Sequence, residues 1–305
     1  MSRAVEQMVD QVSRVILGKE NEIRLALACF FARGHLLIED FPGIGKTTLA
    51  KTIARCMGLD FQRMQFTSDL LPGDILGMSV FDQNTASFSF HPGPVFTQVF
   101  LVDEINRSTP KSQSALLEAM EEGQVTIEGE TRPLKSPFFV IATQNPLEQA
   151  GTFPLPESQM DRFLMRISLG YPDRKAEHRI LTGEGSDRVM GELTSCMEKS
   201  DVRRIQDEVA QVHASGHFLT YLQDILEFTR NSPEFQIGLS PRAGLALLSA
   251  SRAWAYIRGR DYVIPEDLRE ILPWTAGHRL RLNRDLGHLP REQLMDLFSQ
   301  VRVPV

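Results

Sequence analysis

The sequence predicts an α/β protein, in which a five-stranded parallel sheet between helices is followed by a smaller all-α part. Short apolar runs alternate with amphipathic helical stretches up to Tyr171-Pro172, and beyond that point only helical patterns remain. Such alternation is typical of a parallel sheet that helices cover on both faces. A ligand is then expected beyond the carboxyl ends of the strands.

The composition is typical of a water-soluble globular protein. Of 305 residues, 42% are hydrophobic and 24% are charged, and the net charge is −6. A negative net charge argues against a general nucleic-acid-binding protein, because such proteins are usually basic. Cys29, Cys56 and Cys196 are far apart, which favours reduced thiols and matches no metal-site spacing. We find neither a secretion signal nor an apolar stretch long enough to span a bilayer, so we expect a cytoplasmic protein.

The N-terminal elements surround one short strand. Amphipathic helices are expected at 3–17 and 20–33, with Gly18 just past the end of the first. A buried strand, Leu36–Ile38, then precedes a Pro/Gly turn and a helix that continues to Met57. Further strands are expected at 63–66, 99–102, 138–142 and 163–167.

Two insertions interrupt the alternation. Within residues 75–98, Phe81, Phe88 and Phe90 lie in a polar setting around a turn signal, so we expect a hairpin or a loop rather than core. A second hairpin is expected within 123–137. Between the insertions we expect a helix at 111–122, because Ser108 and Thr109 are both suitable N-caps and Pro110 fits the first turn.

The C-terminal part reads as helices only. A helix at 173–182 is followed by a Gly/Ser-rich stretch, 183–200, which is a candidate linker. We therefore divide the chain into domains 1–185 and 186–305. Asp201 is a typical helix start. Helices are expected at 201–213, 217–231, 241–258, 265–280 and 290–300.

The strongest single motif is Asp40-Phe-Pro-Gly-Ile-Gly-Lys-Thr47. A strand, a glycine loop, Lys-Thr and a helix form the layout of a phosphate-binding loop, in which backbone N–H groups and the helix N-terminus bind the anion. Lys46 would reach the β- and γ-phosphates, and Thr47 would offer its hydroxyl to Mg²⁺. Asp40 departs from the usual pattern, which has glycine there, and its carboxylate is unfavourable unless it points away. The expected nucleotide-binding residues of the loop are Pro42, Gly43, Ile44, Gly45, Lys46, Thr47 and Thr48.

Acidic and amide side chains follow two of the predicted strands. Asp103-Glu104 closes an apolar run. An acid at this place can hold Mg²⁺ through water opposite Thr47, and Glu104 can polarise a water for attack on the γ-phosphate. Asn145 ends the next strand, where its amide can bridge the γ-phosphate and the attacking water. Asn before Pro is also a common turn residue.

Two arginines stand where an anionic partner is expected. Arg162 follows Pro154-Leu-Pro156 and precedes the fifth strand. From a subunit edge it can complete a neighbour's site as an arginine finger, an effect of about 10³–10⁵ in rate; a surface salt bridge is the alternative. Arg242 follows Ser240-Pro241 at a helix start, where cations are normally disfavoured. Its expected partner is a triphosphate or a nearby acid such as Glu266.

These motifs together resemble those of MoxR-type AAA+ ATPases over nearly the whole chain. The resemblance is most specific between residues 103 and 163. The matching motifs are Asp40-Phe-Pro-Gly-Ile-Gly-Lys-Thr47, Asp103-Glu-Ile-Asn-Arg107, Pro110-Lys-Ser-Gln-Ser-Ala-Leu-Leu-Glu-Ala-Met-Glu-Glu122, Ala142-Thr-Gln-Asn-Pro-Leu-Glu-Gln149, Gly151-Thr-Phe-Pro-Leu-Pro-Glu-Ser-Gln-Met-Asp-Arg-Phe163, Leu239-Ser-Pro-Arg-Ala243 and Gly259-Arg-Asp-Tyr-Val-Ile-Pro-Glu-Asp267.

The resemblance implies a role for each matching residue. Val15 to Gly18 would contact the adenine, and Asp40 would be a family variant of the loop. Residues 75–98 would be the helix-2 insert and 123–137 the hairpin before sensor 1, both facing a pore or partners. The remaining roles are Walker A for Lys46 and Thr47, Walker B for Asp103 and Glu104, sensor 1 for Asn145, a finger in trans for Arg162, and sensor 2, in cis or in trans, for Arg242.

The resemblance also implies a ring, typically a hexamer, that uses ATP and Mg²⁺ as a chaperone on a protein client. A von Willebrand factor A-domain protein is the partner that it implies. Two alternatives remain: an ATP-gated assembly scaffold with slow hydrolysis, and a magnesium-chelatase-like ATPase subunit. A motor on nucleic acid is least favoured, because 75–98 contain no Lys or Arg and 123–137 contain only Arg132 and Lys135.

Overall fold

The structure, a computed structural model, describes residues 3–84, 86–147, 151–184, 187–283 and 291–303. Its centre is a five-stranded sheet in the order β2-β5-β8-β1-β9, and every neighbouring pair is parallel. The predicted α/β class and strand positions are confirmed. The strands are β1 (Leu36–Glu39), β2 (Phe61–Gln65), β5 (Val99–Asp103), β8 (Phe139–Gln144) and β9 (Met165–Ile167).

Both faces of the sheet are buried, because alternate side chains of each strand enter different hydrophobic clusters. On one face, residues such as Leu36 and Leu101 pack with α1 (Arg3–Val15), α2 (Glu20–Phe31) and α3 (Lys46–Cys56). On the other face, the neighbouring positions Leu37 and Val102 pack with α5 (Pro110–Glu122). Thr109 caps α5 as expected, since its hydroxyl accepts a bond from the Ser112 N–H group. Because the helices cover the faces of the sheet, the carboxyl ends of the strands remain available for the expected ligand site.

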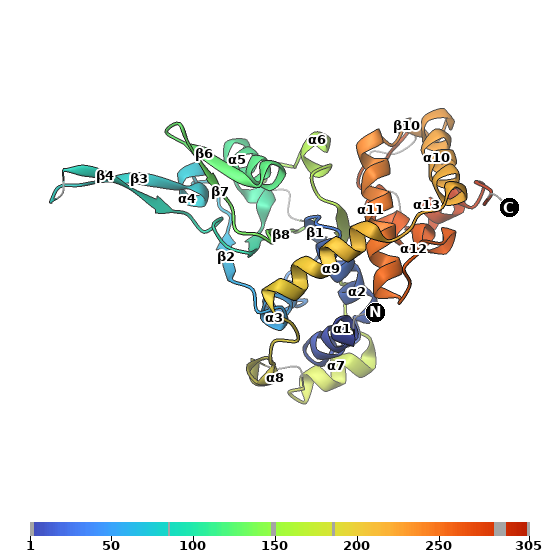
Figure 1. Cartoon of the computed structure of the whole chain (residues 1–305), viewed down its shortest axis with the longest axis horizontal. Coiled ribbons are helices and arrows are strands. Elements are labelled where there is room, and N and C mark those ends of the chain that lie inside the picture. Colours follow the sequence, from blue (N-terminus) through green and yellow to red (C-terminus); the bar gives the residue numbers. More distant parts are fainter. Residues whose placement is uncertain (1–2, 85, 148–150, 185–186, 284–290, 304–305) are drawn as a thin grey trace.

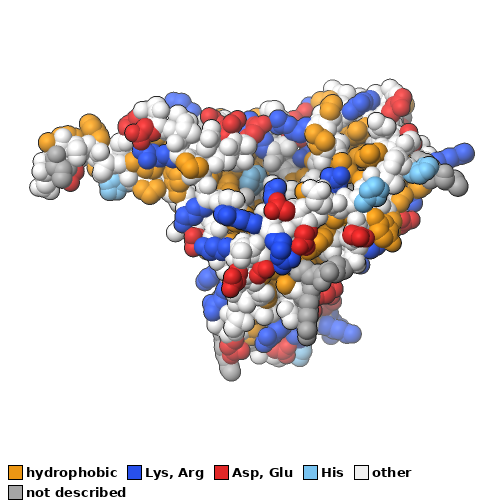
Figure 2. Space-filling view, in the orientation of Figure 1, with side chains coloured by type: hydrophobic (Ala, Val, Ile, Leu, Met, Phe, Trp, Pro, Cys, Tyr) orange, Lys and Arg blue, Asp and Glu red, His pale blue; other side chains and the backbone are white. Residues whose placement is uncertain are grey.

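Two antiparallel hairpins extend from this core (Figure 1). One consists of β3 (Gly77–Asp82) and β4 (Ser87–Pro92), preceded by the short helix α4 (Pro72–Leu76); the other consists of β6 (Gln124–Ile127) and β7 (Glu130–Pro133). The β3–β4 hairpin projects from the body, and Figure 2 shows hydrophobic side chains along it. Its Phe88 side chain is 72% exposed and its Phe81 is 50% exposed.

The hairpins also contact each other. The Ser79 hydroxyl donates to Glu128 at 2.6 Å, and the Arg132 guanidinium lies 4.1 Å from the centre of the Phe90 ring.

The C-terminal part is mainly helical, as predicted. Helix α9 starts at Lys199 rather than at Asp201, because the Asp201 carboxylate accepts a bond from the Glu198 N–H group at 3.1 Å and so stabilises an earlier start. The predicted domain boundary between residues 185 and 186 lies outside the described residues. Helix α6 (Glu157–Met160) still belongs to the sheet-containing part, since it precedes β9. The helices after β9 are α7 (Arg174–Leu181), α8 (Asp187–Glu192), α9 (Lys199–Gln211), α10 (Gly216–Asn231), α11 (Pro241–Ile257), α12 (Pro265–Ala276) and α13 (Arg291–Phe298).

The sequence did not indicate one feature of this part, a two-stranded ladder between β10 (Phe235–Ile237) and β11 (Arg281–Leu282). Over the ranges that the structure describes, no helix combines the length and the apolar character needed to cross a membrane.

A buried histidine links the sheet to α5. His35 precedes β1; its Nε2 donates to the Met120 carbonyl at 3.2 Å, and its Nδ1 accepts from the Val140 N–H group at 3.0 Å. Both bonds require the neutral ring with the proton on Nε2. Burial lowers the pKa of His35 from 6.5 to about 4, against a smaller effect of the Met120 bond.

We therefore predict a pH-dependent loss of stability at His35. Above pH 6.5 its contribution is fully present; as the pH falls to about 4, only the unfolded chain binds this proton. At pH 5 the free energy of unfolding should lie about 2 kcal/mol below its pH 7 value through this group alone. Urea unfolding of wild type and His35→Gln at both pH values isolates the effect. Equal pH dependence of the two proteins would contradict it.

Candidate active site

The P-loop lies between β1 and α3. Gly43 and Gly45 have φ angles of 82° and 93°, which side-chain-bearing residues rarely adopt. Gly45 is the N-cap of α3 and provides no side-chain cap, so the first N–H groups of the helix are left for another acceptor. A Cβ on Gly43 would meet no atom within 4 Å, which shows that this part of the loop is open. The loop is thus shaped to receive an anion.

The Lys46 side chain lies within the loop. Its Nζ donates to the carbonyl oxygens of Asp40 (2.5 Å) and Phe41 (2.9 Å). Burial lowers the pKa of Lys46, while the carboxylates of Asp40, Asp103 and Glu104 act to raise it. The ammonium group and these acids therefore share one electrostatic environment, as expected if the ends of β1 and β5 form one site.

The Asp40 carboxylate points away from the loop, as its departure from the usual pattern required. Oδ2 accepts bonds from the Ser168 hydroxyl (2.9 Å) and the Gly170 N–H group (2.7 Å), and Oδ1 accepts from the Phe41 N–H group (2.9 Å). The residue is 3% exposed. These three bonds explain why the loop contains a carboxylate: it ties the loop to the segment that follows β9.

Asp103 is buried at the end of β5 and has two partners. Its Oδ2 accepts from Arg63 Nε of β2 at 2.6 Å, and its Oδ1 accepts from the Thr143 hydroxyl of β8 at 3.2 Å. Thr143 Oγ1 also accepts from the Glu104 N–H group at 3.1 Å. Thr143 therefore joins the Asp103 carboxylate to the backbone of Glu104.

Glu104 has an unusual backbone for a residue with a side chain. Its φ and ψ are 57° and 52°, the left-handed region that mainly glycine adopts, and such strain is concentrated at functional sites. Its carboxylate pairs with Arg107 Nε at 2.6 Å, and both side chains are partly exposed. Asn145 lies just past β8, where its Oδ1 accepts from the Leu147 N–H group at 3.2 Å, the turn bond expected of Asn before Pro.

The segment predicted to contact adenine lies beside the loop. Gly18 has a φ of 72° and ends the turn after α1. Ile16 Cδ1 lies 3.9 Å from the place that a Cβ on Gly45 would take. The end of α1 and the start of α3 are therefore neighbours in space, although Gly18 and Gly45 are 27 positions apart in the sequence.

Arg162 and Arg242 meet on one acid. Arg162 pairs with Glu121 Oε2 and donates to the Leu117 carbonyl at 2.9 Å. Arg242, at the start of α11, pairs with Glu121 Oε1 at 2.8 Å. Both predicted arginines therefore contact the C-terminal end of α5. The acid paired with Arg242 is Glu121 and not Glu266, the nearby acid that the sequence suggested.

A third arginine completes this group. Arg279, just after α12, donates from Nε to Asp161 Oδ1 at 2.6 Å. Its side chain is 5% exposed, and burial lowers its pKa while Asp161 acts to raise it. We call Glu121, Asp161, Arg162, Arg242 and Arg279 the arginine cluster. Sequence reasoning missed several partners in the site: Arg63, Glu121, Thr143, Ser168 and Arg279.

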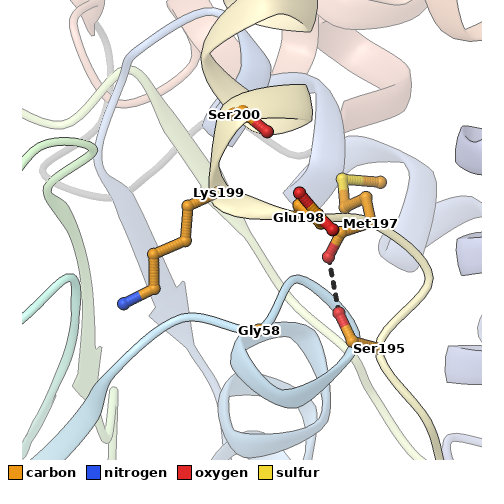
Figure 3. Close-up of a pocket in the computed structure, with 6 residues that line it drawn as sticks. All are labelled: Gly58, Ser195, Met197, Glu198, Lys199 and Ser200. Atoms are coloured by element: carbon orange, nitrogen blue, oxygen red, sulfur yellow. Dashed lines mark hydrogen bonds between the residues drawn. The ribbon is translucent and has the colours of Figure 1, made fainter.

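The interpretation of 183–200 as a linker is wrong for the described part of this stretch, which contains α8 and contacts the end of α3. Arg55 Nε donates to the Leu193 carbonyl at 3.0 Å. Figure 3 shows the pocket formed nearby, with a volume of about 510 Å³, in which the Ser195 hydroxyl donates to the Met197 carbonyl at 2.5 Å. None of the predicted site residues lines it. The lining residues are Gly58, Ser195, Met197, Glu198, Lys199 and Ser200.

Comparison with known proteins assigns the class. A family model described as "ATPase family associated with various cellular activities (AAA)" matches residues 35–165, and one described as "AAA lid domain" matches residues 227–297. The protein is therefore an AAA ATPase with a lid domain. A crystal structure of a candidate ATPase from Cytophaga hutchinsonii superposes with a TM-score of 0.87 at 37% identity, covering 98% of this chain and 94% of that one.

Two relatives narrow this assignment. The chain is 43% identical to the uncharacterized protein YeaC of Bacillus subtilis, over 97% of this chain and 94% of that protein. It is 39% identical to chaperone MoxR1 of Mycobacterium tuberculosis, over 92% of this chain and 76% of that protein. The chain belongs to the MoxR family of AAA ATPases, as its motifs predicted.

The residues present fit a magnesium nucleotide. The glycine loop and the uncapped start of α3 offer N–H donors, and Lys46 supplies a cation. The Thr47 hydroxyl and the Asp103 carboxylate are oxygen donors of the kind that Mg²⁺ prefers. Asp103 would then release one of its present partners.

We predict that Asp40→Asn weakens both the fold and nucleotide binding. The amide nitrogen cannot accept a hydrogen bond, so one side of the buried acceptor set would face N–H donors without a partner, a cost of about 1–3 kcal/mol. Thermal and urea unfolding, with titration of a fluorescent ADP analogue, measure both effects. Ser168→Ala is the matched control, because it removes a single bond and should cost about 1 kcal/mol. An Asp40→Asn protein with wild-type stability and affinity would contradict this role.

Proposed function

We propose that this protein is a Mg²⁺-dependent ATPase that works as a ring and uses hydrolysis to remodel or mature a protein client. The observation that carries the proposal is that Lys46 of the glycine loop lies close enough to Asp103 and Glu104, at the carboxyl edge of the sheet, for both carboxylates to affect its pKa. One cation and two carboxylates at such a loop suit triphosphate binding and attack by water at the γ-phosphate. Membership of an ATPase family supports the same reaction.

Each residue has a distinct role in this reaction. The loop from Pro42 to Thr48 binds the phosphates, and Glu104 accepts a proton from the attacking water, which Asn145 orients. The water oxygen bonds to the γ-phosphorus and the bond to the β–γ bridging oxygen breaks, which gives ADP and phosphate. A magnesium ion held through Thr47 and Asp103 would neutralise phosphate charge. The segment ending at Gly18 contacts the adenine.

The arginine cluster supports a site shared between subunits. Arg162 and Arg242 share Glu121 as a partner, so one surface presents both cations. We infer that they act together in trans, on the nucleotide of the neighbouring subunit in a hexameric ring. Phosphate oxygens would then replace the Glu121 carboxylate as their partner. Because all three side chains are partly exposed, exchanging this ion pair costs little.

Two observations support action on a protein client: the names of related proteins and an exposed hydrophobic surface on the β3–β4 hairpin. Relatives of this chain are named chaperone MoxR1 and MoxR. The β3–β4 hairpin exposes Phe81 and Phe88, as a surface that binds nonpolar segments of a client would. We propose a cytoplasmic protein with a von Willebrand factor A-domain partner, with no role for nucleic acid. Magnesium-chelatase subunits are more distant: the one from Nicotiana tabacum is 28% identical over 66% of this chain.

We predict that Glu104→Gln binds ATP and fails to hydrolyse it. Glutamine keeps the shape of the side chain but cannot take a proton from the attacking water, so turnover should fall by about 10²–10⁴-fold. Phosphate release and equilibrium binding of labelled ATP measure the two properties. Unchanged turnover would contradict the role of Glu104. The alternative, an ATP-gated scaffold, requires assembly to depend on ATP while turnover stays at its basal rate with any partner.

We also predict that Arg162→Ala is inactive alone and is rescued in mixed rings. Its loop still binds ATP, and a Lys46→Ala subunit with an intact Arg162 can supply the missing cation. Turnover in the mixture should therefore exceed that of either variant alone. Activity measured across mixing ratios tests this. Full activity of Arg162→Ala, or of an isolated monomer, would contradict a shared site.

A further inference from the structure

Several hydrogen bonds join the lid domain to the segment that carries Arg162. Arg279 donates through Nη2 to the carbonyl oxygens of Asp161 (3.1 Å) and Phe163 (2.7 Å), and through Nη1 to that of Leu164 (3.1 Å). Its Nε donates to Asp161 Oδ1 at 2.6 Å. The guanidinium thus contacts residues on both sides of Arg162.

Further hydrogen bonds fix Arg279 and the segment that it binds. Arg279 Nη1 also donates to the Thr275 carbonyl of α12, which fixes the guanidinium to its own helix. The neighbouring His278 places Nε2 3.0 Å from the Phe163 carbonyl. Phe163 itself is fully buried. The backbone on both sides of Arg162 is therefore bound to the C-terminal end of α12, so a movement of that end would also move this backbone.

We propose that Arg279 is a positioning residue, which couples the orientation of the lid domain to the placement of Arg162 toward the nucleotide of the neighbouring subunit. This inference rests on the proposed function. A lid that turns with its own nucleotide would move α12, and Arg279 would carry that movement to the segment 161–164. One subunit's lid would thus control hydrolysis in the next.

The chain contains a matched comparison for this contact. Arg281, two residues further on, pairs with Glu157 of α6 at 3.1 Å, and both side chains are more than half exposed. This pair also joins the lid to the core near Arg162. It is a single solvated ion pair, whereas Arg279 is buried and binds the backbone around Arg162. Arg281→Gln therefore tests whether the loss of any arginine at the contact between lid and core would lower kcat.

The first experiment compares Arg279→Gln, Asp161→Asn and Arg281→Gln in the full chain. We expect Arg279→Gln to lower kcat by about tenfold to a hundredfold, since a misplacement of about 1 Å costs this much. Asp161→Asn keeps the carbonyl bonds and should cost less. The dissociation constant for a fluorescent ADP analogue should be unchanged in both. Arg281→Gln should retain wild-type kcat.

The second experiment separates positioning in trans from a local structural role. Arg279→Gln is mixed with Lys46→Ala, whose subunits cannot use ATP but carry a correctly placed Arg162. We expect turnover to recover, as in the matching mixture of Arg162→Ala with Lys46→Ala. A wild-type kcat for Arg279→Gln, or a loss that mixing does not restore while the Arg162→Ala mixture recovers, would overturn the inference.

Failure of the proposed function has a different signature, in which the Arg162→Ala mixture itself does not recover. Thermal unfolding checks that each variant is folded. If Arg279→Gln does not fold, Arg279→Lys replaces it, because lysine keeps the charge and cannot bind four carbonyl groups and a carboxylate at once. Wild-type kcat in a folded Arg279→Lys would equally overturn the inference.

Discussion

The hydrogen bonds of the Asp40 carboxylate join the two halves of the site. The bonds to Ser168 and Gly170 fix the P-loop to the residues just after β9. Strand β9 has only three residues, and just before it lies the segment that carries Arg162. Strand β9 therefore connects the residues that the Asp40 carboxylate binds with the segment that carries Arg162. The P-loop and the arginine proposed to act on a neighbouring subunit's nucleotide are thereby linked within one chain.

The cations of the site have protein partners that phosphate oxygens can replace. Lys46 binds carbonyl oxygens of its own loop, Arg107 pairs with Glu104, and Arg162 and Arg242 pair with Glu121. Partly exposed ion pairs contribute little stability, so their exchange is inexpensive. Asp103 differs, because its carboxylate is buried and also bound to the Thr143 hydroxyl. Its position is therefore fixed by the fold, while its Arg63 partner is half exposed and able to leave.

Features that depend only on neighbouring residues could be predicted from the sequence. The strands, the P-loop and the Asp103-Glu104 pair follow from apolar runs, glycines and residue order, and the structure places them as predicted. The contacts that join distant segments could not be predicted, because no local signal specifies them. Asp40 and Gly170 are 130 residues apart, and Glu121 and Arg242 are 121 residues apart. The β10–β11 ladder was missed for the same reason, since each strand is too short to show a period.

The position of Glu121 connects the arginine cluster to the projecting hairpins. It lies in the last turn of α5, and β6 begins three residues later at Gln124. The Leu134 N–H group donates to the Gly123 carbonyl at 2.9 Å, which closes the β6–β7 hairpin onto the end of α5. Glu128 and Arg132 of that hairpin then contact Ser79 and Phe90 of the β3–β4 hairpin. A change of partner at Glu121 would act on a set of contacts that leads to the hairpin with the exposed phenylalanines. These contacts would give the proposed nucleotide chemistry at a subunit edge a short route to the surface proposed to bind the client.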